Sequence, residues 1–347
     1  MAGENNGKKP LLLVDAYSQI YRGFYAVRSL SNSKGLPSNA VFAMAKLLLR
    51  LDKEYPSFDG AFVFDKGKIE KRLAIAPDYK ANRPPMPEEL KMQIPYIRDL
   101  ITAFGWNIIE QEGYEADDLM GGMAKNFTDR KVLILSSDKD ISQVIDKEDR
   151  VNMLVPSHDG KGLNIRSWEE TIRKFGVAPD RIVDYLSLIG DSSDNIPGVP
   201  GVGPKTAAAL INENGSIEEM LHDPQRIKKE SLREKILAHK EVLKKNILLI
   251  SLILDLPEEA GINASSVTKT EVQMEKIFSI VQEFELKSII KELEKLSVNT
   301  GKNENTPPPP VPEEDLFSSL ASSGATKEEN EKKEEKQEEN QQLFFNF

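Results

Sequence analysis

Three short apolar segments constrain the fold of this chain more than any other feature. They have the length of buried strands, and a fourth candidate comes after them: Leu11–Asp15, Ala61–Asp65, Val132–Ser136 and Val151–Val155. Amphipathic segments lie between them, one predicted to begin at Ser38 and another after Pro87. Strands that alternate with helices predict an α/β fold, with a mostly parallel sheet flanked by helices.

Acidic residues collect where these segments end. Because the carboxyl ends of parallel strands meet at one edge of a sheet, we expect acids there to lie close together. A second group of acids opens a predicted helix in the segment YEADD. A third group is a pair of aspartates three positions apart in GDSSDN, where a helical turn would put both side chains on one face. The nine candidates are Asp15, Asp65, Glu115, Asp117, Asp118, Asp138, Asp140, Asp191 and Asp194. Each alone is explained as a cap or turn residue, but nine gathered together would repel one another unless cations neutralise them.

The composition narrows the metal that such a cluster would bind. The chain has no cysteine and three histidines, which excludes disulfides and thiolate chemistry and disfavours structural zinc. Oxygen ligands favour Mg²⁺ or Mn²⁺, and a pair of such ions cleaves phosphodiesters in two-metal nucleases. No segment has the length of a signal peptide or a membrane span, so we expect a cytoplasmic protein without a membrane partner.

The net charge of −10 conceals an uneven distribution. Residues 301–347 carry 5 basic and 11 acidic groups, which leaves 41 basic and 45 acidic groups in residues 1–300. Without the nine candidate ligands the acidic count falls to 36. A basic surface around an acidic pit suits a protein that binds nucleic acid.

Six motifs in order give the chain a family resemblance: VDAYSQIYRGFYA, FVFDKGKIEKR, YKANRPPMPEEL, GYEADD, SSDKD and GDSSDNIPGVPGVGPKTA. Over roughly residues 10–295 it resembles the 5′ nuclease domain of bacterial DNA polymerase I, within the flap endonuclease family. The resemblance implies a PIN-like core, a helical arch and a helix-hairpin-helix DNA-binding subdomain. It also implies removal of 5′ flaps, RNA primers or 5′ nucleotides in lagging-strand processing and repair, with the nine acids as metal ligands.

The predicted organisation has three parts. A PIN-like core covers 8–165 with an arch at about 66–104, a helical region covers 166–298 with the hairpin at about 190–215, and a tail covers 299–347. The pattern becomes helical from about Trp168, with apolar helical faces that include Val242–Leu254 and Ile277–Leu296. The family's polymerase and proofreading-like domains are missing, so we expect a stand-alone nuclease or a truncated product. The tail holds a run of four prolines, Pro307–Pro310, and a highly charged segment, a composition typical of disorder.

A basic segment, YKANR, precedes two prolines. It is either a solvated loop or, as the resemblance implies, a phosphate contact made by Lys80 and Arg83, with Arg72 and Arg22 nearby. Cations there would stabilise developing negative charge, and Tyr79 could stack on an end base. Lys71 stands where polymerase-linked relatives usually carry an aromatic residue, which leaves the local substrate contact open.

The glycine-rich segment before Thr206 invites a P-loop interpretation, which fails because Pro204 separates the glycine from the lysine and no strand precedes it. It resembles a helix-hairpin-helix, whose backbone N–H groups at a helix start hold a phosphate of duplex DNA without reading its sequence. A monovalent cation, K⁺, often accompanies this region in the family. A purely structural turn is the alternative. The candidate DNA contacts are Gly198, Gly201, Val202, Gly203, Lys205 and Thr206.

The tail ends in an apolar peptide that resembles the motif by which bacterial replication proteins bind the sliding clamp. Its candidate contacts are Gln342, Leu343, Phe344, Phe345 and Phe347. Phe345 replaces the usual leucine and Asn346 intervenes, so another partner, or a terminus that folds back, stays open.

These expectations combine into one mechanism with two rivals. Nicked or flapped DNA rests on the hairpin, its 5′ strand enters the arch, and the carboxylates and their cations bind the scissile phosphate. Asp118, Asp191 and Asp194 are expected to act through metal-bound waters or a further ion. The rivals are an RNA-cutting toxin-type PIN nuclease, which lacks the hairpin and arch, and a catalytically silent DNA-binding scaffold. We expect a monomer.

Overall fold

The computed structural model describes residues 8–27, 30–157 and 162–300, with side chains as far as 296. The chain forms two compact units. The first contains the described parts of Met1–Ile69, Met86–Leu154 and Leu252–Pro308, and the second contains Glu70–Pro85 and the described part of Val155–Ser251. The chain therefore leaves the first unit twice and returns to it, an interleaving that the predicted division at 165 does not contain.

A parallel sheet forms the centre of the first unit. Its strands are β1 (Leu11–Asp15), β2 (Asp59–Phe64), β3 (Asn107–Glu110), β4 (Val132–Leu135) and most of β5 (Val151–Pro156), in the order β3-β2-β1-β4-β5. Every residue of β1, β2 and β4 is buried, as expected of parallel strands covered on both faces. The predicted fold class is confirmed. The strand that the sequence did not reveal, β3, has only one fully buried residue and therefore no continuous apolar run.

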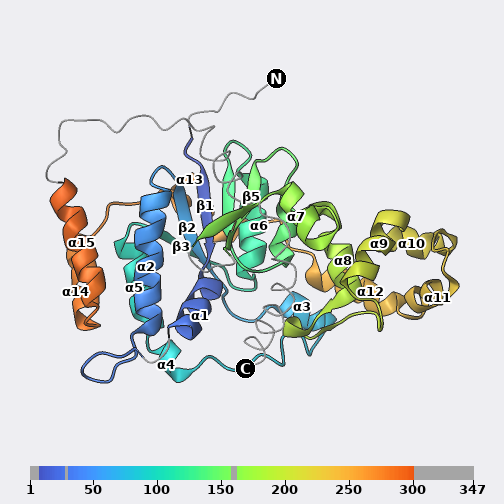
Figure 1. Cartoon of the computed structure of the whole chain (residues 1–347), viewed down its shortest axis with the longest axis horizontal. Helices are drawn as coiled ribbons and strands as arrows, with labels where there is room; N and C mark the ends of the chain where they lie inside the picture. The colour runs from blue at the N-terminus through green and yellow to red at the C-terminus, as the bar shows by residue number, and fades with distance from the viewer. Residues whose placement is uncertain (1–7, 28–29, 158–161, 301–347) are drawn as a thin grey trace, which may run out of the picture. The chain divides into compact units, whose positions relative to one another are not determined.

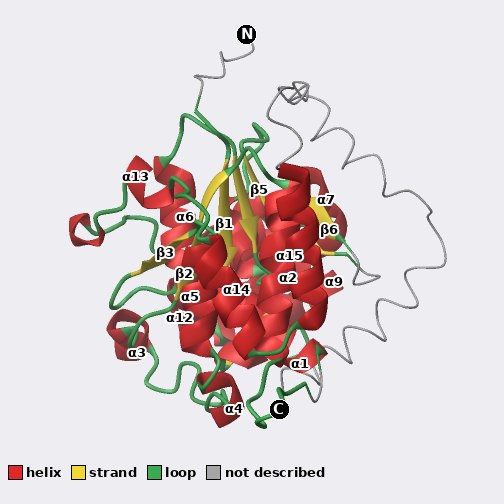
Figure 2. Ribbon diagram, turned by 90° about the vertical axis from the view of Figure 1, so that its left-hand side faces the viewer, coloured by secondary structure: helices red, strands yellow, loops and turns green. Residues whose placement is uncertain are grey.

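Helices cover both faces of this sheet. In Figure 1, α2 and α5 lie to the left of the strands and α6 to the right, and Figure 2 shows the same layers after a quarter turn. The helices of this unit are α1 (Ala16–Ala26), α2 (Asn39–Glu54), α4 (Glu88–Lys91), α5 (Ile94–Ala103), α6 (Ala116–Asn126), α13 (Ala264–Val267), α14 (Met274–Glu283) and α15 (Lys287–Thr300), with the 3-10 turns η1 (Asp140–Val144) and η5 (Glu258–Ala260).

Two predicted helices are interrupted. The helix after Pro87 is a single turn, α4, followed by α5. The helix expected over Ile277–Leu296 is divided into α14 and α15 by a turn in which Glu285 has a φ of 54°. An apolar pattern continues across such a turn, so its periodicity does not reveal the break.

The second unit is mostly helical, as predicted from about Trp168. Its elements are α3 (Glu70–Ile75), β6 (Leu163–Arg166), α7 (Trp168–Phe175), η2 (Pro179–Arg181), α8 (Ile182–Ile189), β7 (Gly190–Asp191), η3 (Ser192–Asp194), β8 (Ile196–Pro197), α9 (Pro204–Asn214), α10 (Ile217–His222), η4 (Pro224–Arg226), α11 (Glu230–Ala238) and α12 (Lys240–Ile250). The helix predicted over Val242–Leu254 ends early, because Ser251 is already extended. Across the described ranges, no helix combines the length and the apolar character needed to cross a bilayer.

Candidate metal centre and nucleic-acid interface

Asp15 lies at the junction of β1 and α1, where it caps the helix. Its Oδ1 accepts a hydrogen bond from the backbone N–H of Ser18 at 3.0 Å, and its Oδ2 accepts one from Ser136 Oγ at 2.8 Å. Burial and the negative charge of Asp65 raise the pKa of Asp15 to about 7, against the opposing effect of these two hydrogen bonds. Asp138 raises it further. The negative charges of Asp65 and Asp138 therefore both act on Asp15, so acids that follow three different strands lie near one another.

Ser136 joins two of these acids, a role that the sequence analysis missed. Its buried hydroxyl donates to Asp15 and accepts from the backbone N–H of Asp138 at 3.0 Å. Asp138 Oδ1 in turn accepts from the backbone N–H of Asp140 at 2.9 Å, at the start of η1. Hydrogen bonds from backbone to side chain thus connect the residues of the SSDKD segment. Its two serines were the sequence feature that could have indicated this role.

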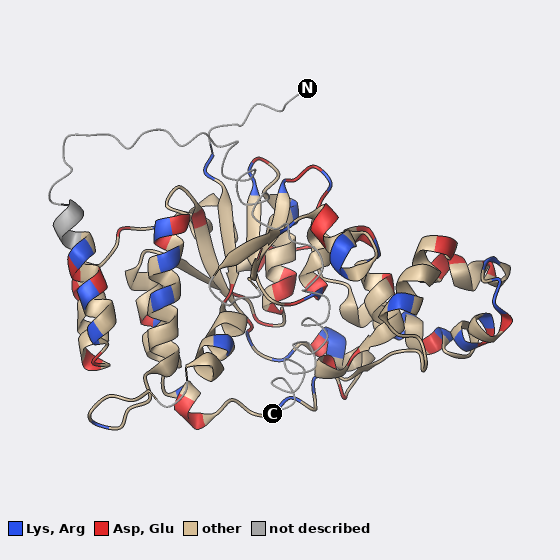
Figure 3. Ribbon diagram, in the orientation of Figure 1, with Lys and Arg blue, Asp and Glu red and all other residues tan. Residues whose placement is uncertain are grey.

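The acids at the start of α6 have different partners. Figure 3 marks this end of the helix in red. Asp65 Oδ1 accepts from the N–H of Ala116 at 2.8 Å, which ties the end of β2 to α6. Asp118 is fully buried, and accepts from the N–H groups of Glu115 (3.2 Å) and Ile253 (2.8 Å). Asp117 lies half-buried in the same first turn. Asp118 thus holds the segment after α12 against the helix.

Two glycines in α6 permit this close packing. A Cβ on Gly121 would lie 2.8 Å from Leu254 Cδ2, and one on Gly122 would lie 2.4 Å from Leu256 Cδ2. Either contact is shorter than van der Waals distance. Gly122 has the stricter requirement, because a Cβ there would also lie 2.9 Å from the backbone carbonyl oxygen of Leu254.

The candidate ligands have the oxygen donors and the negative charge that a divalent cation needs, but their side-chain positions suit an ion less well. Within the part of the chain that the structure describes, no three Asp, Glu, His or Cys side chains are gathered closely enough to hold an ion. Yet burial and the charges of Asp65 and Asp138 all oppose the ionised form of Asp15, so this edge concentrates negative charge from hard oxygen donors. Carboxylates now bonded to backbone N–H groups would have to turn toward an ion.

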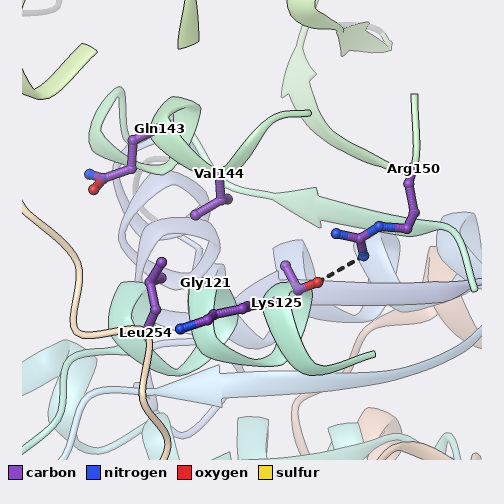
Figure 4. A pocket seen from close by; sticks show the side chains of 7 residues that line it. Gly121, Lys125, Gln143, Val144, Arg150 and Leu254 are labelled. Carbon is purple, nitrogen blue, oxygen red and sulfur yellow. Dashed lines mark hydrogen bonds between the residues drawn. The ribbon is translucent and has the colours of Figure 1, made fainter. Parts of the chain in front are cut away.

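A small pocket of about 200 Å³ lies between α6 and η1. Figure 4 shows its lining, in which Arg150 donates to the carbonyl oxygen of Ala124 at 2.8 Å. Gln143, which also lines it, donates to the carbonyl of Asp140 at 2.8 Å and accepts from the N–H of Leu252 at 3.1 Å. Gln143 therefore supports Asp140, and sequence patterns gave no signal for it.

The other two candidate ligands lie in the second unit. Asp191 caps η3, and its Oδ1 accepts from the N–H (2.9 Å) and hydroxyl (2.5 Å) of Ser193. Asp194 is approached by the cations expected to bind phosphate: Arg83 Nη2 bonds its Oδ1, and Lys80 Nζ lies 3.7 Å from its Oδ2. The turn that carries Lys80 and Arg83 is thus docked on an acidic loop.

Two residues predicted to contact DNA are buried instead. Arg72 is 3% exposed, and donates to the carbonyls of Leu249 (3.0 Å) and Ser251 (3.3 Å) at the end of α12. Tyr79 is 8% exposed, with its hydroxyl 3.2 Å from Asp194 Oδ2, so its ring is not offered to a base in this structure. The sequence left a solvated loop open for the segment with Tyr79 and placed Arg72 near the phosphate contacts, but both side chains pack inward. Arg22 does lie exposed, on α1.

The glycine-rich segment forms the hairpin that the sequence predicts. Its base is the antiparallel pair β7–β8, and Gly203 is the N-cap of α9, with Pro204 at the first helical position. Gly201 has a φ of 77° and needs to be glycine. Val202 is buried, whereas Gly203 and Lys205 are exposed and Thr206 is half-buried beside them. The start of α9 is therefore accessible to an anion. The five candidate contacts at the C-terminal end lie outside the described residues.

Comparisons with known proteins agree with this architecture. Residues 10–176 match the family model described as 5′-3′ exonuclease, N-terminal resolvase-like domain, and residues 177–273 match its C-terminal SAM fold. Among solved structures, bacteriophage T5 5′-exonuclease with bound zinc ions is 21% identical, with a TM-score of 0.58 over 79% of this chain and 99% of the T5 chain. The catalytic core of Rad2 in complex with DNA is 15% identical, with a TM-score of 0.57 over 83% and 94%. At these identities the two structures show a shared fold.

Sequence relatives are nearer. The 5′-3′ exonuclease of Aquifex aeolicus is 38% identical over 83% of this chain and 96% of its own length. DNA polymerase I of Caldicellulosiruptor bescii is 37% identical over 82% of this chain, which spans about a third of that protein (33%). With both family models matched in order and a relative matched along nearly its whole length, the chain belongs to the 5′-3′ exonuclease family.

Proposed function

We propose that this chain is a structure-specific 5′ nuclease that hydrolyses phosphodiester bonds at 5′ flaps, nicks and RNA primers. Its work would be lagging-strand maturation and DNA repair. One observation carries the proposal: carboxylates that follow β1, β2 and β4 lie near enough to act on Asp15, whose pKa is raised to about 7 by burial and by the charges of Asp65 and Asp138. Such an arrangement is costly without cations and useful with them.

The reaction consumes one water for each bond broken. Water oxygen bonds to phosphorus, the bond from phosphorus to the 3′ oxygen breaks, and that oxygen takes a proton, which leaves a 5′-phosphate and a 3′-hydroxyl. Two or more Mg²⁺ or Mn²⁺ ions would lower the pKa of the water and offset the charge that develops on the phosphate. In the first unit the candidate ligands are Asp15, Asp65, Glu115, Asp117, Asp118, Asp138 and Asp140.

The residues of this chain supply order around that chemistry. Ser136 fixes Asp15 and Asp138 relative to each other, and Gln143 fixes the backbone of Asp140. We propose that Lys80 and Arg83 bind a phosphate of the 5′ strand, where positive charge stabilises the transition state. A phosphate would then replace the carboxylate of Asp194 as their partner.

The hairpin is the proposed site for duplex DNA. Backbone N–H groups at the exposed start of α9, together with Lys205 and Thr206, suit a phosphate. Further basic residues lie on α11 and directly before it, including Lys228, Lys229 and Arg233. Figure 3 shows blue segments in this part of the chain. A K⁺ ion held by hairpin carbonyls belongs to this proposal.

Two further expectations complete it. The terminal peptide with Leu343 and Phe345 would bind a bacterial sliding clamp, and the protein would act as a cytoplasmic monomer. Titration of a purified clamp with the native peptide and with a Leu343→Ala/Phe345→Ala peptide tests the first expectation. Equal binding of the two peptides would end it.

A cleavage assay tests the nuclease. A 5′-labelled double-flap DNA is incubated with the protein in Mg²⁺ or in EDTA, beside Asp140→Ala and the control Asp255→Ala, whose carboxylate is 94% exposed. We expect cleavage near the flap junction that requires Mg²⁺, survives in the control and is lost in Asp140→Ala. Tight binding without cleavage in Mg²⁺ or Mn²⁺ supports the scaffold, and cleavage confined to RNA supports the toxin-type nuclease.

A further inference from the structure

The second unit contains a buried amide that no feature of the proposed reaction uses. Asn246 lies in the middle of α12 and is fully buried. An amide in that position costs free energy unless its hydrogen bonds are made. A leucine would fill similar space without that requirement, so the side chain needs an explanation.

The Asn246 amide bridges two segments that lie far from it in the sequence. Its Nδ2 donates to the carbonyl oxygen of Ser187 at 3.0 Å and to that of Pro197 at 2.7 Å. Ser187 belongs to the last turn of α8, where carbonyl groups lose their helical partners. Pro197 belongs to β8, the second strand of the hairpin base. The Asn246 N–H₂ group therefore connects the end of α8, which leads into the hairpin, to β8, the second strand of the hairpin base.

Packing at this base leaves little tolerance. Gly190 pairs with Pro197, and a Cβ on Gly190 would lie 2.4 Å from the backbone nitrogen of Gly198. A Cβ on Gly198 would lie 2.2 Å from the carbonyl oxygen of Ile189. The N–H of Val199 also donates to the carbonyl of Leu188 at 2.8 Å. Two backbones in direct contact are thus fixed from the α12 side by Asn246.

The proposed phosphate site comes directly after this base in the chain. Val199 and Val202 anchor the turn, Gly203 caps α9, and the exposed N–H groups of the helix start come next. A rotation of the base would move these donors together. Phosphate binding is stronger when the donors are already held in one arrangement, because ordering them on binding costs free energy.

We propose that Asn246 is a positioning residue for the duplex-binding site, fixing the hairpin so that the start of α9 presents its N–H groups to a DNA phosphate. The proposal rests on the proposed function of the hairpin. It predicts a specific defect: weaker binding of duplex DNA with little change in the turnover of bound substrate.

The test compares Asn246→Leu with Asn214→Leu. Asn214 is a buried amide of the same unit, and its Nδ2 donates to the carbonyl oxygen of Leu210 within its own helix, so it controls for the loss of a buried amide without a bridge. Thermal unfolding followed by circular dichroism shows that each variant folds. If Asn246→Leu does not fold, Asn246→Ser, which keeps one donor and leaves room for a water, replaces it.

Binding is measured by fluorescence anisotropy in Ca²⁺ with a nicked duplex and with a single strand of the same sequence, and KM and kcat are measured in Mg²⁺. For Asn246→Leu we expect the Kd and KM of the duplex to rise about tenfold, the size of a 1.4 kcal/mol loss, with kcat within about twofold and single-strand binding unchanged. The Asn214 control should match the wild type. Equal duplex affinity of Asn246→Leu and wild type, or equal losses in both variants, would overturn the proposal. A wild type that does not bind duplex DNA would instead refute the proposed function.

Discussion

Replacing Asp15 by asparagine should stabilise the metal-free protein at alkaline pH. In the folded protein the ionised carboxylate is buried and is repelled by Asp65 and Asp138, whereas the amide has no charge to desolvate or to repel. Asparagine keeps the local structure, because its Oδ1 can accept from the N–H of Ser18 and its Nδ2 can donate to Ser136 Oγ. It is also as good an N-cap as aspartate.

The sign and size follow from the pKa of Asp15. Its value of about 7 in the folded protein lies above the ordinary 3.8, so the folded state binds this proton more tightly than the unfolded state. The stability it contributes is fully present below about pH 4 and is lost as the pH rises through 7. A difference of about three on the pH scale, at ~1.4 kcal/mol for each, gives an upper limit of roughly 4 kcal/mol. Asp15→Asn should recover part of that amount at pH 8 and almost none at pH 4.

The assay is urea unfolding followed by circular dichroism, in EDTA, at both pH values. Asp255→Asn serves as the matched control, because its carboxylate is exposed on the same unit. We expect Asp15→Asn to raise the free energy of unfolding at pH 8 by about 1 kcal/mol or more. Added Mg²⁺ should stabilise the wild type more than the variant, since a bound ion stabilises the folded state in proportion to its affinity. A variant no more stable than wild type at pH 8, or a gain of the same size at both pH values, would show that the buried, repelled charge of Asp15 does not destabilise the folded protein as argued.

Three further predictions concern packing and pairing. Gly122→Ala should lower the free energy of unfolding by about 1–3 kcal/mol, measured in urea, because its Cβ would meet Leu256 at 2.4 Å; an unchanged stability would contradict the packing argument. Asp194→Asn should bind a 5′ single strand severalfold more tightly in EDTA at low salt, because Arg83 and Lys80 lose a competing carboxylate. The two ion pairs are partly exposed, and each is worth up to about 1 kcal/mol. Fluorescence anisotropy that shows weaker binding by the variant would contradict this prediction. Arg72→Met should destabilise the protein by about 2–5 kcal/mol, because two carbonyls at the end of α12 lose a buried donor; a shift of the urea midpoint near zero would make Arg72 a dispensable cap.

The strands and their acids were predictable from sequence because both depend on local patterns. A strand buried on both faces is a short apolar run, and a parallel sheet brings the residues that end such strands to one edge. Asp15 and Asp65 therefore lie at the edge of the sheet where their strands end, as their own sequence segments predicted. The break between α14 and α15 was not predictable, since the apolar positions continue through Glu285 although its backbone is left-handed.

The partners of charged side chains were the other limit. The sequence marks Arg72 as a cation near a basic loop, but not that it caps a helix at Leu249, 177 positions later in the chain. It marks Asp118 as one of three acids close together, but not that Ile253 donates to it. In both cases the partner is a backbone group, and backbone groups are present at every position, so the side chain's composition and spacing carry no information about which one it will meet.

Partners also divide the nine acids into physically different groups. The charge of Asp15 is opposed by burial and by the charges of Asp65 and Asp138, and this is the energetic cost that a cation can offset. Asp118 is fully buried and accepts two backbone N–H bonds, so removing it would release the segment after α12 as well as one carboxylate. Asp194 already has cationic partners within its own unit. Loss of activity in an alanine series would therefore not identify metal ligands by itself. When the charge of a metal ligand is removed, the stability of the metal-free protein rises. When a positioning acid is removed, stability falls with or without metal.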